Sequence, residues 1–228
     1  MQNKTFVISL GGSVMVPDEI DENFLKKFRA FILNKTKSGY RFIIITGGGK
    51  ICRKYNQAAI NISRASILEQ DWLGIETTKL NALLLKTILG KNAHPVLLDE
   101  RKKIKSFGKY SVIVGCGWKP GSSSDFDAVQ TALDFNIKTV INLTNQDFVY
   151  TADPKKDKTA KLILQISWKD FLELIPKKWV SGLNAPFDPL ATKTAMRNNL
   201  KVIMANGRNL ANLEKIITGK KFKGTTIY

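Results

Sequence analysis

The sequence predicts an α/β fold in which a mostly parallel central sheet is covered by helices on both faces, as a three-layer sandwich. Short apolar runs alternate with longer amphipathic segments along all 228 residues, and this alternation is typical of parallel strands joined by crossover helices. Two of the runs, residues 6–10 and 42–46, stop directly at glycines, as buried parallel strands do. No Pro/Gly/Ser-rich linker and no repeat interrupts the pattern. We therefore expect a single domain over residues 1–228.

Each element follows from its own local pattern. Apolar β-branched and aromatic runs predict strands at residues 6–10, 42–46, 96–98, 111–114, 138–143, 200–205 and 225–227, the last at an edge of the sheet. Amphipathic spacing and capping residues predict six helices: one capped by Asp21 and ended before Gly39, then 50–62, 73–89, one capped by Ser124 with Asp127 in a capping-box position, one starting at Asp188-Pro189, and 210–218.

The chain is strongly basic, with a formal net charge of +17. Its basic runs at residues 101–105, 155–158 and 220–223 lie in loop-like stretches without interleaved aromatic residues. This pattern favours a solvated surface that attracts anionic metabolites. Nucleic acid is left open as a partner but is not favoured. No stretch reaches the roughly 18 unbroken apolar residues of a membrane helix, so we expect no membrane partner.

Cysteine and histidine usage limits the chemistry. Two cysteines, Cys52 and Cys116, do not make a disulfide framework, and the first residues lead directly into a strand without a signal peptide. Both observations predict a cytoplasmic protein. The single histidine, His94, argues against a zinc site and against a triad that needs a second histidine. We assign no metal-ligating side chains.

Two glycine clusters follow the first two expected strands. They are Gly11-Gly12-Ser13 and Gly47-Gly48-Gly49-Lys50. Glycine lets backbone amides approach an oxyanion closely, and a helix that starts there directs free N–H groups and its positive dipole end at the anion. Two such clusters, one beside a lysine, predict a site that holds two phosphate-bearing ligands face to face.

Two further loops follow strands at the same edge of the sheet, where ligands of such folds bind. Residues 115–125 are glycine-rich and then offer three serines and a carboxylate, although taken alone they are more simply a turn and a helix cap. Residues 142–154 are long and polar where a tight turn would suffice. No Gly-x-x-x-x-Gly-Lys-Ser/Thr motif is present, which excludes a P-loop kinase.

At these loops the chain resembles the amino acid kinase family, in its archaeal-type uridylate (UMP) kinase branch. Residues 145–154, Asn-Gln-Asp-Phe-Val-Tyr-Thr-Ala-Asp-Pro, are similar to its Thr-Asn-Val-Asp-Gly-Val-Tyr-Thr-Ala-Asp-Pro loop. Residues 47–55 resemble its Gly-Gly-Gly-Lys-x-x-Arg-x-Tyr segment. Its Asp-x-x-Gly-Ile…Asn-Ala and Asp-Pro-Leu-Ala-x-Lys helices are matched at 71–82 and 188–193. The resemblance covers nearly the whole chain.

The resemblance implies transfer of the ATP γ-phosphoryl group to UMP, with UDP as the product. It implies an acceptor UMP site in about residues 1–120 and an ATP site in about 121–228. The implied ATP contacts are Gly11, Gly12, Ser13, Gly49, Arg53, Thr144, Asn145, Tyr150 and Asp153. The implied UMP contacts are Gly48, Asp71, Gly115, Gly117, Ser122, Ser123 and Ser124.

Catalysis should rest on positioning and on charge neutralisation, because the acceptor phosphate is already ionised. Lys50 and Lys193 are the predicted cations on the transferred group, and Asp125 is predicted to orient a lysine. Mg²⁺ should accompany ATP. Relatives form hexamers, which implies a homo-oligomer. Taken alone, Lys193 on a helix is more simply a solvated lysine.

Three features depart from the family pattern, and one of them is the Trp118-Lys119 pair in the loop of residues 115–125. Many relatives carry a lysine two residues before the first glycine pair, where this chain has Ser9. Phe148 replaces the usual glycine of the nucleotide loop. Two alternatives therefore stay open: a kinase of the same fold that acts on another small phosphate or carboxylate, and a weakly catalytic protein that binds nucleotides or nucleic acid.

Overall fold

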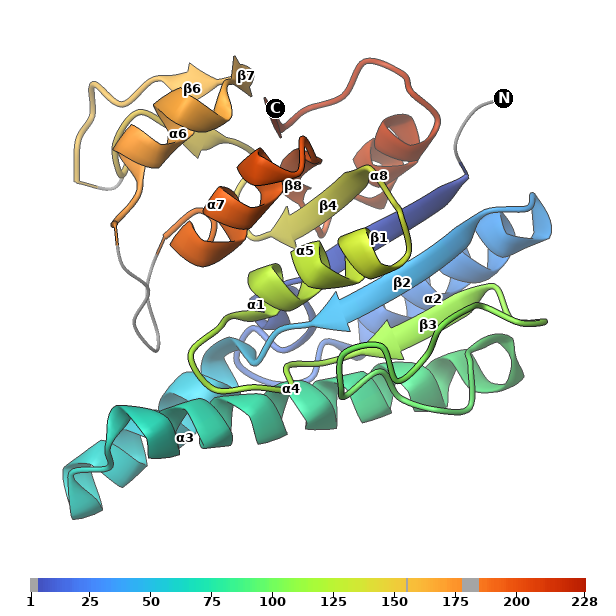
Figure 1. The fold of residues 1–228 in the computed structure, drawn as a ribbon, viewed down its shortest axis with the longest axis horizontal. Helices are drawn as coiled ribbons and strands as arrows, with labels where there is room; N and C mark the ends of the chain where they lie inside the picture. Colours follow the sequence, from blue (N-terminus) through green and yellow to red (C-terminus); the bar gives the residue numbers. More distant parts are fainter. Residues whose placement is uncertain (1–3, 155, 178–184) are drawn as a thin grey trace.

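The computed structural model describes residues 4–154, 156–177 and 185–228. It confirms the predicted α/β class (Figure 1). Within the described residues, one seven-stranded sheet has the order β3-β2-β1-β4-β8-β9-β7. Its strands are β1 (Thr5–Leu10), β2 (Arg41–Thr46), β3 (Val112–Gly115), β4 (Thr139–Thr144), β7 (Gln165–Ile166), β8 (Lys201–Asn206) and β9 (Thr225–Ile227). The five strands from β3 to β8 run parallel, and β9 turns antiparallel against β8.

Helices cover both faces of this sheet. They are α1 (Gly12–Met15), α2 (Glu22–Lys37), α3 (Gly49–Ser63), α4 (Ile67–Leu89), α5 (Ser124–Asp134), α6 (Trp168–Leu174), α7 (Pro189–Arg197) and α8 (Leu210–Ile217), with a short 3₁₀ turn at Gly90–Asn92. In Figure 1, α5 and α7 cross the near face, and the α3–α4 pair reaches beyond the sheet at the lower left.

Two apolar cores result from the alternation of side chains along the strands. On β1, Ile8 faces the core beneath α2, α4 and α8, whereas Val7 faces the core beneath α5, α6 and α7. Ser9, two residues after Val7, therefore lies on the α5 face. On β4, Asn142 follows Val140 by two residues and shares that face.

Capping side chains fix where the helices begin. Asp21 accepts a hydrogen bond from Phe24 N at 2.9 Å, as predicted. The side chain of Asp188 caps α7 by accepting from Leu190 N and Ala191 N, with Pro189 at the first helical position. α4 begins at Ile67, six residues before the predicted start, because Ser66 and Glu69 form a capping box there.

Three sequence predictions are wrong in detail. Residues 96–98 form no strand. The segment of residues 93–98 pairs with β3 only through isolated bridges at Ala93 and Leu98, which lie on either side of Pro95. β9 is not an edge strand, because the two-residue β7 pairs outside it. Ser123, not Ser124, caps α5, which places Asp127 in the buried interior instead of a capping box.

The structure adds elements that the sequence patterns did not predict. They are the one-turn α1, the helix α6, and a hairpin of β5 (Val149–Tyr150) and β6 (Leu162–Ile163). Two of the segments discussed above lie partly outside the described residues: residues 1–3, which precede the first strand, and Lys155 of the basic run 155–158. Among the described helices, none is long and apolar enough to cross a membrane.

Candidate active site

The two glycine clusters pack against each other backbone to backbone. A Cβ on Gly12 would lie 2.2 Å from Gly49 N and 2.5 Å from Gly47 O. Gly49 has a φ of +70°, a conformation that favours glycine. β1 and β2, which carry the two clusters, are hydrogen-bonded neighbours. The predicted convergence of the glycine clusters is therefore present in the structure.

A cavity of 260 Å³ opens over these clusters, and we call it the glycine pocket. Its lining includes ten of the residues predicted for the site: Gly11, Gly12, Ser13, Gly48, Gly49, Arg53, Ser124, Asp125, Thr144 and Asn145. It also includes Ser9, Gly47 and Asn142 at the carboxyl ends of β1, β2 and β4. The strand ends thus form the wall of a polar cavity.

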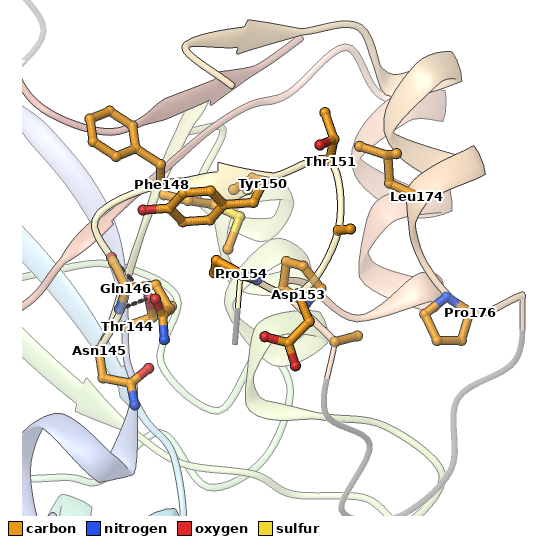
Figure 2. Close-up of a pocket in the computed structure, with 15 residues that line it drawn as sticks. Thr144, Asn145, Gln146, Phe148, Tyr150, Thr151, Asp153, Pro154, Leu174 and Pro176 are labelled. Carbon is orange, nitrogen blue, oxygen red and sulfur yellow. Dashed lines mark hydrogen bonds between the residues drawn. The ribbon is translucent and has the colours of Figure 1, made fainter. Parts of the chain in front are cut away.

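A second cavity, of 410 Å³, lies beneath the loop after β4, and we call it the loop pocket (Figure 2). Thr144, Asn145, Tyr150 and Asp153 line it, as predicted. Phe148, Leu174 and Pro176 add apolar surface. Thr144 Oγ1 accepts from Gln146 N at 3.0 Å, which holds the start of the loop. A pocket that combines apolar and polar side chains in this way is suited to a flat heterocycle with a polar attachment.

The two cavities are adjacent, because Thr144, Asn145, Ala185 and Pro186 line both of them. One elongated ligand can therefore place a ring in the loop pocket and an anionic tail over the glycine clusters. Arg53 is the one Lys or Arg side chain that lines either cavity among the described residues. Its Nη2 donates to Ser13 Oγ at 3.3 Å, so it lies across the gap between the two clusters.

Asp125 is the carboxylate of the glycine pocket. Ser9 Oγ donates to its Oδ1 at 2.9 Å. Burial and the nearby Asp188 carboxylate raise the pKa of Asp125 to about 7. Burial and the same neighbour hold the pKa of Asp127 well above its usual range, and burial raises the pKa of Asp188. Asp125 was predicted to orient a lysine, and in the structure its partner is the Ser9 hydroxyl.

These raised pKa values predict how stability changes with pH. Between about pH 4 and pH 7 the folded protein keeps a proton on Asp125 that the unfolded chain has lost, so the free energy of unfolding should fall as the pH rises. One full proton contributes about 1.4 kcal/mol per pH unit. Asp125→Asn should make the fall shallower but not remove it, because Asp127 and Asp188 also have raised pKa values; urea denaturation across this range would measure the change. Asp134→Asn, which removes the partner of Arg101, should keep the fall, and identical curves for Asp125→Asn and wild type would contradict this account.

The residues predicted for the acceptor meet on the α4 side of the clusters. Asp71 Oδ2 accepts a hydrogen bond from Gly121 N at 2.8 Å, and Gly117 N donates to Thr78 Oγ1 at 2.9 Å. A Cβ on Gly48 would lie 3.7 Å from Gly74 O, so the second cluster adjoins the same helix. α4 thus holds the loop of residues 115–124 beside the second glycine cluster.

Three other predicted acceptor residues have structural partners. Gly115 ends β3 and pairs with Ile45. Ser123 caps α5 by accepting from Phe126 N at 3.4 Å, and Ser122 Oγ donates to Lys119 O at 3.1 Å. None of the three is among the residues that line the two cavities.

The structure places both predicted catalytic lysines on the surface. Lys50 Nζ donates to Asp18 Oδ1 at 2.7 Å, and both side chains are exposed. Lys193 is exposed on α7. Neither lines the glycine pocket or the loop pocket. Their catalytic roles stay predictions.

Sequence reasoning missed two polar residues of the site. It treated Ser9 as the loss of a cation, and it placed Asn142 at the start of a loop. Both lie inside strands that were predicted, at 6–10 and 138–143, and the structure adds that both lie on the cavity wall. The available signal was their position, since each interrupts an otherwise apolar run that is buried on both sides.

This arrangement defines a class of protein: an α/β protein that opposes two glycine loops, suited to anions, at the carboxyl ends of parallel strands. The model of the amino acid kinase family matches residues 4–206. The chain therefore belongs to the amino acid kinase family.

Its relatives agree with this assignment over nearly the full length. The chain is 34% identical to a uridylate kinase of Methanocorpusculum labreanum, over 97% of this chain and 94% of that protein. It is 36% identical to one of Thermoplasma volcanium, over 99% and 98%. The crystal structure of a uridylate kinase from Archaeoglobus fulgidus has a TM-score of 0.83 at 31% identity and covers 98% of this chain and 99% of that one.

Proposed function

We propose that this protein is a UMP kinase that transfers the γ-phosphoryl group of ATP to UMP. The observation that carries the proposal is the pair of opposed glycine clusters under a cavity that continues into the loop pocket. The uridylate kinase relatives and the Archaeoglobus fulgidus structure support the same activity. This activity also accounts for both parts of the site: the two adjacent pockets would hold ATP, and the α4 side of the second glycine cluster would hold UMP.

ATP occupies the loop pocket and extends into the glycine pocket in this proposal. Its base and ribose lie among Thr144, Asn145, Tyr150 and Asp153, and its phosphates lie over Gly11, Gly12, Ser13 and Gly49. The shared lining of the two cavities supports this path. Residues of about 121–228 thus supply the base and ribose contacts of ATP, and the glycine clusters of the first part receive its phosphates, within the single domain.

UMP binds from the α4 side, within about residues 1–120 and the loop that follows. Asp71, Gly48 and Gly117 are the proposed contacts there, with Gly115 and Ser122 to Ser124 shaping the loop around them. The hydrogen bond between Asp71 and Gly121 supports this placement, because it brings the predicted acceptor residues together beside the second glycine cluster.

The chemistry needs no general base, because the UMP phosphate is already ionised and its oxygen is the nucleophile. Backbone amides of the glycine clusters and the Arg53 guanidinium neutralise the charge of the transferring group. Lys50 and Lys193 remain proposed cations. For Lys50 to act, its ammonium exchanges the Asp18 carboxylate for a phosphate oxygen.

Mg²⁺ is the proposed companion of ATP. Magnesium is usually held by one or two carboxylates together with substrate phosphates, and it prefers hard oxygen ligands. The glycine pocket offers the Asp125 carboxylate and the Ser13 hydroxyl, which fit that donor set. Asp125 would hold the ion, and the ion would neutralise charge on the β- and γ-oxygens.

Acceptor selectivity tests the proposal. We expect UMP to be phosphorylated in preference to CMP, AMP and GMP, because the relatives are uridylate kinases and the hydroxyl-rich loop 115–125 can pair with uracil. Steady-state rates with ATP and each monophosphate, with acetylglutamate as a carboxylate acceptor, would measure it. Equal or faster turnover of CMP would contradict the uracil preference, and no turnover of any monophosphate would contradict the kinase proposal.

The protein also forms a homo-oligomer in this proposal, through the α3–α4 pair that extends beyond the sheet. Large apolar side chains are exposed on these two helices, and Ile62 reaches 86% exposure. The exposed residues are Tyr55, Ile60, Ile62, Ile67, Leu68, Trp72, Leu80 and Leu83. Exposed apolar surface of this kind is typical of interfaces. Light scattering should give a multiple of 25.5 kDa for the wild type and a smaller mass for Ile62→Lys. A wild-type mass of one chain would contradict the proposal.

A cytoplasmic location completes the proposal. Cys52 and Cys116 are both free thiols in the structure. Unpaired cysteines are ordinary in a reducing compartment, which supports the placement.

A further inference from the structure

Asn142 is a polar side chain in the middle of the sheet. It lies in β4 between Ile141 and Leu143, which face the opposite core. Its register partner in β1 is Ser9, so the two side chains stand side by side on the face covered by α5. β1 and β4 are central strands of the sheet, and their parallel pairing fixes the backbone positions of Ser9 and Asn142.

In the part of the chain that the structure describes, the amide of Asn142 has no partner for its N–H group. The residue is 2% exposed, and Nδ2 is buried without a hydrogen-bond acceptor among the described residues. Among the other buried asparagines, Asn81 Nδ2 donates to Gly47 O at 2.8 Å and Asn212 uses both ends of its amide on Lys223, whereas Asn56 has an unpaired Oδ1 but no unpaired N–H group. A buried donor that is left unpaired costs stability, so its presence calls for an acceptor from elsewhere.

The location of Asn142 indicates that the missing hydrogen-bond acceptor is an oxygen of a bound ligand. Asn142 lines the glycine pocket beside Ser9 and Asp125. The Ser9 hydroxyl donates to Asp125, so that donor is already used. No lysine side chain lines this pocket among the described residues, and Arg53 lies across the opening on Ser13. The Asn142 amide is therefore a buried and unused donor of this pocket, in addition to the polar side chains of Ser13, Ser124, Thr144 and Asn145 that also line it.

We propose that Asn142 is a catalytic residue whose side-chain N–H donates a hydrogen bond to an oxygen of the transferring phosphoryl group. This inference rests on the proposed phosphoryl transfer. It gives the pocket floor a neutral donor where Ser9 stands in place of the lysine of many relatives. The amide transfers no proton and forms no bond. It stabilises charge that spreads over the phosphoryl oxygens as the bond to the leaving ADP breaks and the bond to the acceptor oxygen forms.

The test compares Asn142→Leu with the matched control Asn212→Leu. Asn142→Leu should lower kcat about 10²-fold, the effect of removing one donor to a transition state, with each KM changed by less than about threefold. Its melting temperature should stay equal to that of the wild type or rise, because an unpaired buried donor is removed. Asn212→Leu breaks two hydrogen bonds far from the site and should lower the melting temperature with kcat unchanged.

Asn142→Asp is the second variant, nearly identical in shape but without the donor when ionised. At about pH 9, where this carboxyl is ionised, it should lower kcat at least as much as Asn142→Leu. For Asn142→Leu, which adds no charge, binding of a β,γ-imido analogue of ATP, measured by calorimetry, should stay within about threefold. Near-normal kcat in either variant would overturn the inference. So would a fall in melting temperature and analogue affinity that accounts for the lost rate, since that result indicates a structural asparagine.

The two proposals fail separately in this design. Wild-type turnover of UMP reports on the proposed function. The ratio of variant to wild-type rate, with whichever acceptor the wild type phosphorylates, reports on Asn142.

Discussion

Gly12→Ala should abolish measurable phosphoryl transfer and lower the free energy of unfolding. The added Cβ would lie 2.2 Å from Gly49 N and 2.6 Å from Gly48 C, distances that no real Cβ shows. The obstructing atoms are backbone, so the two glycine clusters have to separate, and an ångström-scale displacement at the reacting groups costs about 10²-fold or more in rate. We expect a loss of at least about 10³-fold in kcat/KM, together with a lower midpoint in urea.

The control for this variant is Gly74→Ala on α4. A Cβ there would meet Cys52 Sγ at 3.5 Å, an ordinary contact, and alanine favours a helix interior over glycine by roughly 0.5–1 kcal/mol. Gly74→Ala should therefore be as stable as the wild type or more stable. An active Gly12→Ala enzyme would show that the clusters need not touch in order to position the phosphates.

Arg53→Met should lower kcat/KM by about 10²–10³-fold, the second largest effect that we expect. Arg53 is the one cationic side chain lining either cavity among the described residues, and it reaches Ser13 across the opening between the clusters. Charge-assisted bonds from a forked guanidinium to phosphate are strong and directional. Arg53→Lys should recover part of the rate, because it keeps the charge but not the fork. Steady-state kinetics in ATP and UMP would measure both.

Lys54→Met is the matched control for Arg53. Lys54 is the next residue of α3, is exposed, and does not line either cavity. Its loss removes the same charge from the same helix and should change kcat/KM by less than about threefold. Equal effects of Arg53→Met and Lys54→Met would mean that the general field of the basic surface, not the Arg53 contact, attracts the nucleotides.

The central strands and their glycine ends could be predicted from sequence, because a buried parallel strand shows as an apolar run that stops abruptly. The short elements could not. β7 has two residues, Gln165 and Ile166, and it forms only because β9 offers a partner that is distant in sequence. The start of α4 was readable, since Ser66 and Glu69 form a capping box, but the apolar spacing from Leu73 was the stronger pattern.

The candidate site shows the same division. The backbone of the glycine clusters and the polar loop after β4 were predictable, because their residues sit at fixed offsets from strands. The partners of individual side chains were not predictable. Lys50 lies beside three glycines in sequence, yet its ammonium pairs with Asp18 of an earlier loop. Asp125 meets Ser9 only because α5 packs over β1. Such contacts depend on how a helix lies on a sheet, which local patterns do not encode.

The attachment of the two glycine clusters to neighbouring strands has a consequence for how the enzyme keeps its geometry. Hydrogen-bonded strands lie about 4.8 Å apart, and β1 and β2 are paired from Thr5 and Arg41 to Leu10 and Thr46. The separation of the two glycine clusters is thus set by the hydrogen-bonded pairing of β1 with β2. In the proposed kinase, surface loops can move to admit and release nucleotides while the distance between the two glycine clusters stays constant. This distance changes only when the central strands of the sheet unfold. The glycine clusters and the folded core should therefore lose their structure in the same cooperative transition.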